Sequence, residues 1–225
     1  MRDTAAAQKQ EAPMATVLTF AQQKGGSGKT TLCAHFAVEL AARGLRVALL
    51  DSDPQGSLGR WFMTRFDRDS GLKGDLTFST ASAWGVSYEA SKYRDSHDFV
   101  LIDTPPKIDS DLRPALKVSD MIIVPVTASQ VDLWATEGVL EMAAREGKRP
   151  LAVLNRARSG TKLTQSVKAA LSELEADPAE AVIANRVAYA EALGVGLGVA
   201  ELSGAGVAAQ EIAALADEVL GLLDI

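Results

Sequence analysis

The sequence predicts an α/β fold in which a doubly wound, mostly parallel β-sheet is flanked by helices. Short apolar runs that end in a polar residue recur along the chain, and stretches with helical spacing lie between them. Continuous apolar runs are typical of strands that are buried on both faces, as in a parallel sheet. Regular strand–helix alternation builds such a sheet through right-handed crossovers.

The predicted elements follow one another in a simple order. The apolar runs, read as strands, are 16–21, 45–50, 98–102, 121–126 and 150–154. The stretches read as helices are 32–42, 111–118, 132–145, 163–174 and 207–223. Ligands of doubly wound sheets bind at the carboxyl ends of the strands. The polar residues that end the apolar runs are therefore the candidate site residues.

Length and composition favour one globular domain. Of the 225 residues, 47% are apolar and 23% are charged, which excludes a disordered, collagen-like or low-complexity class for most of the chain. We expect 1–15 to be a flexible N-terminal tail, with Met1 and Met14 both open as the native start, and 16–225 to form the single domain. The lone cysteine, Cys33, excludes an internal disulfide and indicates reducing surroundings.

A glycine-rich segment separates the first predicted strand from the first predicted helix. It reads Gln-Lys-Gly-Gly-Ser-Gly-Lys-Thr-Thr over 23–31. Small residues let the backbone wrap around an anion, and consecutive amide N–H groups at a helix N-terminus point at phosphate oxygens. Lys29 is expected to reach the β- and γ-phosphates, and the Thr30 hydroxyl to hold Mg²⁺.

The same segment resembles the deviant phosphate loop of the ParA/MinD family of ATPases. Gln23 stands where the general phosphate loop has its first glycine, and a second lysine, Lys24, follows. The resemblance implies that Lys24 reaches across an ATP-bound homodimer to the partner subunit's nucleotide and helps to stabilise the charge of phosphoryl transfer. It also implies that ATP is bound by the loop residues Lys24, Gly25, Gly26, Ser27, Gly28, Lys29, Thr30 and Thr31.

Carboxylates end two of the apolar runs. Asp51 and Asp103 each follow a run directly, and Asp53 comes two residues after Asp51. Because carboxylates bind Mg²⁺ in phosphoryl-transfer sites, often through water, Thr30, Asp51 and Asp103 are the predicted metal ligands. The strings Asp-Ser-Asp-Pro-Gln-Gly and Asp-Thr-Pro-Pro look like family motifs. The resemblance implies that Asp53 orients the attacking water and that Asp103 also belongs to the nucleotide site. The predicted catalytic residues are Lys24, Lys29 and Asp53.

Asn155 ends the last apolar run. In the family an asparagine at this strand end reads the adenine base, and the resemblance implies the same role for Asn155. For Arg156, contact with adenine, contact with phosphate and a solvated charge all remain open. A later segment, 183–189, resembles the family's Ile-Pro-x-Arg segment, with Ala184 in place of the proline.

The charges of the chain are unevenly distributed. The net charge of −6 counts against a nucleic-acid partner, but the last 39 residues carry six acids and no Lys or Arg, so the remainder is neutral overall. Residues 145–168 contain seven basic side chains and one acid. Such local positive density suits sequence-independent DNA binding, although a solvated helix face is the alternative. The predicted DNA-binding residues are Arg156, Arg158, Lys162, Lys168 and Arg186.

Together these features predict a short ParA-like ATPase with ATP and Mg²⁺ as cofactors. We expect an ATP-dependent homodimer that binds nucleoid DNA in the cytoplasm and positions or segregates a cargo (a plasmid, a chemoreceptor cluster or a microcompartment). A cargo-linked activator protein is expected to stimulate its weak hydrolysis. Two alternatives remain, a metabolic enzyme of the dethiobiotin or cobyrinic acid synthase type and a membrane-surface MinD-like ATPase. The acidic final helix argues against the latter, because an anionic membrane would repel it.

Overall fold

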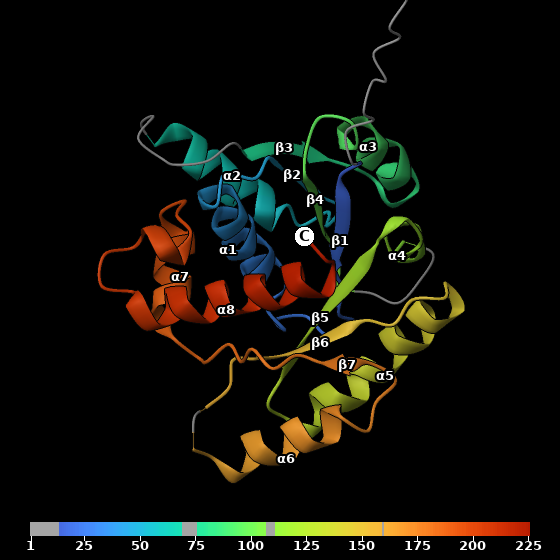
Figure 1. Cartoon of the computed structure of the whole chain (residues 1–225), viewed down its shortest axis with the longest axis vertical. Helices are drawn as coiled ribbons and strands as arrows, with labels where there is room; N and C mark the ends of the chain where they lie inside the picture. The colour runs from blue at the N-terminus through green and yellow to red at the C-terminus, as the bar shows by residue number, and fades with distance from the viewer. Residues whose placement is uncertain (1–13, 69–75, 107–110, 159) are drawn as a thin grey trace, which may run out of the picture.

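The computed structural model describes residues 14–68, 76–106, 111–158 and 160–225. Within these ranges seven parallel strands form one sheet in the order β3-β2-β4-β1-β5-β6-β7 (Figure 1). The strands are β1 (Thr16–Phe20), β2 (Val47–Asp51), β3 (Leu76–Thr80), β4 (Phe99–Asp103), β5 (Met121–Thr127), β6 (Leu151–Asn155) and β7 (Asp177–Pro178). The predicted fold class is confirmed, and each predicted strand is present with its ends shifted by at most two residues.

Helices cover both faces of the sheet (Figure 1). Helices α1, α2, α7 and α8 contribute to the core on one face, and α3, α4, α5 and α6 to the cores on the other. The helices are α1 (Lys29–Ala42), α2 (Ser57–Asp67), α3 (Val86–Tyr93), α4 (Arg113–Val118), α5 (Gln130–Arg145), α6 (Lys162–Leu171), α7 (Val187–Gly194) and α8 (Gly206–Leu222). Two short 3₁₀ turns lie at Ala83–Gly85 and Val199–Glu201.

Strand β4 shows why a buried parallel strand has an uninterrupted apolar sequence. Successive side chains of a strand point to opposite faces of the sheet. Phe99 and Leu101 pack in the core beneath α1 and α8, whereas Val100 and Ile102 pack in the core beneath α3. Both faces are covered, so every position of the strand before its last residue, Asp103, is apolar.

The domain begins slightly earlier than the sequence predicts. The predicted tail falls mostly on 1–13, which lie outside the described residues. Ala15 is buried, and its backbone N–H donates to the Arg94 carbonyl oxygen at 2.8 Å. Ala15 therefore belongs to the folded domain rather than to the tail.

Candidate nucleotide site and basic surface

Three neighbouring strands end at the same edge of the sheet. Strand β4 lies between β2 and β1, with Asp103 in register with both Asp51 and Phe20. The glycine-rich segment follows β1, so the sheet order brings it beside the carboxylates that end β2 and β4. The sequence-predicted phosphate loop and acidic residues therefore meet in one place.

The phosphate loop runs directly into α1. Gly28 precedes the helix with φ +95°, a left-handed conformation that glycine adopts without steric cost. A Cβ atom at Gly28 would collide with the side-chain amide of Asn155. That amide donates from Nδ2 to the Ser27 carbonyl oxygen at 2.7 Å, and its Oδ1 accepts the Arg156 N–H at 2.9 Å. Asn155 thus holds the loop in place, while its predicted reading of adenine stays a prediction.

Thr30 and Asp103 form the core of a candidate metal site. The Thr30 hydroxyl donates to Asp103 Oδ2 at 2.6 Å, and Asp103 is fully buried. Burial raises the pKa of Asp103 to about 7, opposed by the Thr30 hydrogen bond. Its other oxygen, Oδ1, has no hydrogen-bond partner among the described residues. A buried carboxylate oxygen without a partner, beside a hydroxyl at a phosphate loop, fits a site for Mg²⁺ and its water ligands.

Lys29 and Asp53 line a cavity of about 600 Å³ in front of the loop, together with Gly25, Gly26, Gly28, Thr30 and Thr31. Lys29 is 6% exposed, and burial lowers the pKa of its ammonium group, while the charges of Asp103 and Asp53 oppose that shift. The cavity thus combines a buried cation, loop backbone and a half-buried carboxylate. This combination suits the binding of a polyphosphate beside a residue that can orient water.

Asp51 ends β2 beside Asp103. Its Oδ1 accepts the Asp53 N–H at 3.0 Å and its Oδ2 accepts the Gly59 N–H at 2.9 Å. Burial raises the pKa of this carboxyl group as well. Asp51 therefore shapes the loop that presents Asp53, and its role as a metal ligand stays a prediction.

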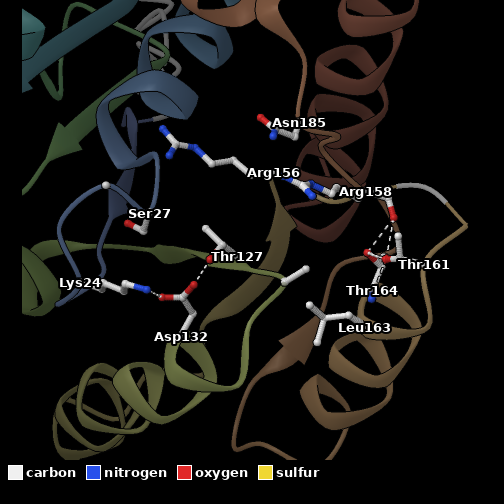
Figure 2. A pocket seen from close by; sticks show the side chains of 12 residues that line it. Lys24, Ser27, Thr127, Asp132, Arg156, Arg158, Thr161, Leu163, Thr164 and Asn185 are labelled. Carbon is white, nitrogen blue, oxygen red and sulfur yellow. Dashed lines mark hydrogen bonds and ion pairs between the residues drawn. The ribbon is translucent and has the colours of Figure 1, made fainter.

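Lys24 does not line the phosphate cavity, and its side chain points toward Asp132 (Figure 2). Its ammonium group forms an ion pair with Asp132 at the start of α5, and the Asp132 carboxylate also accepts from the hydroxyl groups of Thr127 and Ser129. The Lys24 side chain is 40% exposed and the Asp132 side chain 4% exposed. Together with Arg158, Lys24 lines a surface pocket of about 460 Å³ that adjoins the phosphate cavity. No pattern in the sequence indicates the Asp132 contact.

Two further contacts attach α5 to the phosphate loop. Gln22 Nε2 donates to the Thr136 hydroxyl at 3.0 Å. A Cβ atom at Gly138 would collide with the side-chain amide of Gln23. The beginning of the loop, including Lys24, is therefore packed against one face of α5.

A small cavity of about 150 Å³ lies between α1, β6 and α7, and its lining mixes apolar side chains such as Leu32 and Ile183 with polar ones such as Asn155. His35 supports one wall of it. His35 Nδ1 accepts the Val199 N–H at 3.0 Å, and its Nε2 lies 3.1 Å from the Tyr189 carbonyl oxygen. Burial lowers the pKa of His35 to about 4, so the ring is neutral at physiological pH. The size and lining of the cavity suit a nucleobase.

Two of the predicted DNA-binding residues are paired with carboxylates. Arg186 donates to Glu211 Oε1 from Nε at 2.9 Å and from Nη2 at 2.7 Å, and Glu211 also accepts the Tyr189 hydroxyl at 2.7 Å. Arg186 therefore connects the start of α7 to α8, and its contact with DNA stays a prediction. Lys168 is paired with Glu180 at 3.3 Å.

The other three predicted DNA-binding residues lie closer together. Arg158 and Lys162 are exposed, and neither has an ion pair among the described residues. Arg156 is exposed as well and lines the same surface pocket as Arg158, but it also lines the phosphate cavity and the small cavity. The basic surface that remains is the turn containing Arg158 and the start of α6.

A phosphate loop between β1 and α1, with a carboxylate at the end of the adjacent β4, defines a P-loop nucleotide-binding domain. The chain belongs to the CobQ/CobB/MinD/ParA nucleotide-binding domain family, whose sequence profile matches residues 18–199. The family prediction is confirmed.

Individual relatives cover almost the whole chain. The chain is 30% identical to maintenance of carboxysome distribution protein A of Halothiobacillus neapolitanus over 213 residues, which span 92% of this chain and 97% of the relative. Two solved structures share the fold. The ATP complex of a McdA variant from Cyanothece superposes with a TM-score of 0.75 at 17% identity, covering 95% of this chain and 98% of the other. The pNOB8 ParA bound to nonspecific DNA does so with a TM-score of 0.68 at 19% identity, covering 94% and 99%.

These similarities confirm the predicted class of function, that of the partition and positioning ATPases. In the parts of the chain that the structure describes, no helix is long and apolar enough to cross a membrane.

Proposed function

We propose that this chain is an ATP-dependent dimerising switch that binds DNA without sequence preference and positions a cargo through a partner that stimulates hydrolysis. The observation that carries the proposal is the placement of Lys24. This lysine belongs to the phosphate loop, yet it lines a surface pocket outside the cavity that Lys29 and Asp53 line. A loop lysine that does not line its own phosphate cavity can meet the nucleotide of a second subunit once its ion pair with Asp132 opens.

Within one subunit the residues have distinct tasks. The loop amides and Lys29 bind the phosphates, and Thr30 and Asp103 hold Mg²⁺. A bound Mg²⁺ would neutralise charge on the phosphate oxygens. Asp53, presented by the loop that Asp51 shapes, orients the attacking water. Lys24 of the opposite subunit adds positive charge where negative charge develops.

DNA binding follows from dimerisation. Arg158 and Lys162 lie near the pocket that Lys24 lines. A dimer doubles this basic surface, and affinity for DNA rises steeply with each added phosphate contact because counterions are released. The carboxysome distribution protein of H. neapolitanus, named for its cargo, supports a large assembly as the cargo here. The chain would then act on the nucleoid, in the cytoplasm.

The test is binding to random-sequence DNA with ATP, with ADP and without nucleotide, at several salt concentrations. The proposal predicts salt-sensitive binding that requires ATP and is lost in Lys24→Ala and in Arg158→Glu. Lys92→Glu on α3, at the other end of the sheet, is the matched control and should bind normally. Equal binding by Arg158→Glu and the unmodified protein contradicts the proposal. Turnover that requires a small carboxylic acid and ignores DNA would instead indicate a metabolic enzyme.

A further inference from the structure

Arg156 has an unusual backbone conformation. Its φ is +52°, and Asp224 is the other non-glycine residue with positive φ in the described ranges. The left-handed region costs free energy for a residue with a Cβ atom, and such residues cluster at binding sites. The surroundings of Arg156 must therefore hold it in place.

Hydrogen bonds on both sides of Arg156 maintain this conformation. Its own N–H donates to Asn155 Oδ1 at 2.9 Å. The next residue, Ala157, donates its N–H to the Ile183 carbonyl oxygen at 3.0 Å and accepts the Asn185 N–H at 2.8 Å. Because Asn155 also holds the phosphate loop, the backbone of Arg156 and the loop are fixed to each other.

The strained backbone directs the guanidinium toward the loop. In Figure 2 the Arg156 side chain extends toward the loop that carries Ser27, while Arg158 lies nearer Thr161. A Cβ atom built on Gly28 would lie 3.9 Å from Arg156 Nε. No ion pair to Arg156 is found among the described residues. An arginine without a carboxylate partner thus lies over the end of the phosphate loop.

Arg156 lines the pocket that Lys24 lines, and it also lies where two further cavities meet. The phosphate cavity and the small cavity share three lining residues, which are Thr31, Arg156 and Leu193. A nucleotide that places its base in the small cavity and its terminal phosphates near Lys29 must pass this junction. The group at the junction is the α-phosphate with its ribose.

We propose that Arg156 binds the α-phosphate of the nucleotide and is a positioning residue of the nucleotide site rather than a DNA contact. The inference rests on the proposed function. A guanidinium suits this task because its planar donors match phosphate oxygens. The α-phosphate is present in ATP and ADP alike, so Arg156 contributes equally to the binding of both and does not distinguish them.

The test compares binding of fluorescent ATP and ADP analogues, with Mg²⁺ and without DNA, by the unmodified protein and by Arg156→Gly. Glycine adopts φ +52° without strain, so this variant keeps the fold. Loss of a charge-assisted hydrogen bond predicts about tenfold or greater weakening for both nucleotides. Asp224→Gly, which removes positive-φ strain away from the site, is the matched control and should bind both normally.

Each remaining outcome is informative. Affinity of Arg156→Gly within about twofold of the unmodified protein overturns the inference, as does weakening confined to ATP. If Arg156→Gly binds both nucleotides normally and loses DNA binding, Arg156 contacts DNA and the inference is overturned. Failure of the unmodified protein to bind either nucleotide would overturn the proposed function itself, and the inference with it.

Discussion

The ammonium group of Lys24 is paired with the Asp132 carboxylate of its own subunit, at the first turn of α5. If Lys24 acts on a nucleotide in another subunit, as proposed, it must first leave this carboxylate. On that proposal, the Lys24–Asp132 pair opposes dimerisation.

Asp132→Asn is expected to strengthen ATP-dependent dimerisation. An ion pair to a partly exposed lysine is worth about 0.2–1 kcal/mol, and a dimer breaks two of them, which corresponds to a gain of up to roughly thirtyfold in dimer affinity. Asparagine retains an oxygen for the hydroxyls of Thr127 and Ser129. Sedimentation velocity with a non-hydrolysable ATP analogue measures the effect, and unchanged or weaker dimerisation would argue against a restraining pair.

The pH dependence of stability should report the burial of Asp103. Its pKa is about 7 in the folded protein and near the usual value of 3.8 when unfolded, so the folded state binds the extra proton between these pH values. Stability of the nucleotide-free protein should therefore fall as pH rises from about 4 to 7, by an amount of the order of a few kcal/mol.

Asp103→Asn removes this titration and keeps an oxygen for Thr30. The variant should melt at a higher temperature than the unmodified protein at pH 8 and show no such advantage at pH 5. Thermal denaturation at the two pH values, without nucleotide or metal, measures the difference. If the melting temperatures of the two proteins differ by the same amount at pH 5 and at pH 8, burial of Asp103 does not make stability depend on pH.

Gly138→Ala tests the packing of the phosphate loop on α5. The added methyl group would collide with the Gln23 side chain, so the loop or the helix must shift. Overpacking of this kind costs roughly 1–3 kcal/mol of stability. Urea denaturation measures that loss, and Gly221→Ala, where a Cβ atom meets nothing within 4 Å, is the matched control. Equal stability of the two variants would show that Gln23 moves aside without cost.

The strands with wholly buried sequences could be predicted, and the half-exposed elements could not. Strand β3 (Leu76–Thr80) is an edge strand with partly exposed side chains on both faces, so its sequence lacks an uninterrupted apolar run. Helix α2 (Ser57–Asp67) has few buried residues, and one of them is Arg65, which forms an ion pair with Glu201 at 2.6 Å. Because Arg65 occupies a buried position, the buried face of α2 is not a continuous apolar stripe, which is the pattern that predicts a helix from sequence.

The phosphate loop was predictable because its residues are consecutive, whereas contacts between distant segments were not. The pairing of Lys24 with Asp132 depends on the position of β5 beside β1 in the sheet. For the basic residues, too, an acidic partner from a distant segment could not be predicted. Arg186 contributes a positive charge in the sequence, but Glu211 on α8 balances that charge in the structure.

The most direct test of the central claim mixes two inactive variants, Lys24→Ala and Asp53→Ala, and measures ATP hydrolysis. If Lys24 acts on the partner subunit's nucleotide, a mixed dimer contains one site with an intact Asp53 and an intact Lys24. An equal mixture should then recover about a quarter of the unmodified activity, because half of the dimers are mixed and each has one working site. Hydrolysis no greater than the sum of the two variants alone would contradict a role for Lys24 across the dimer.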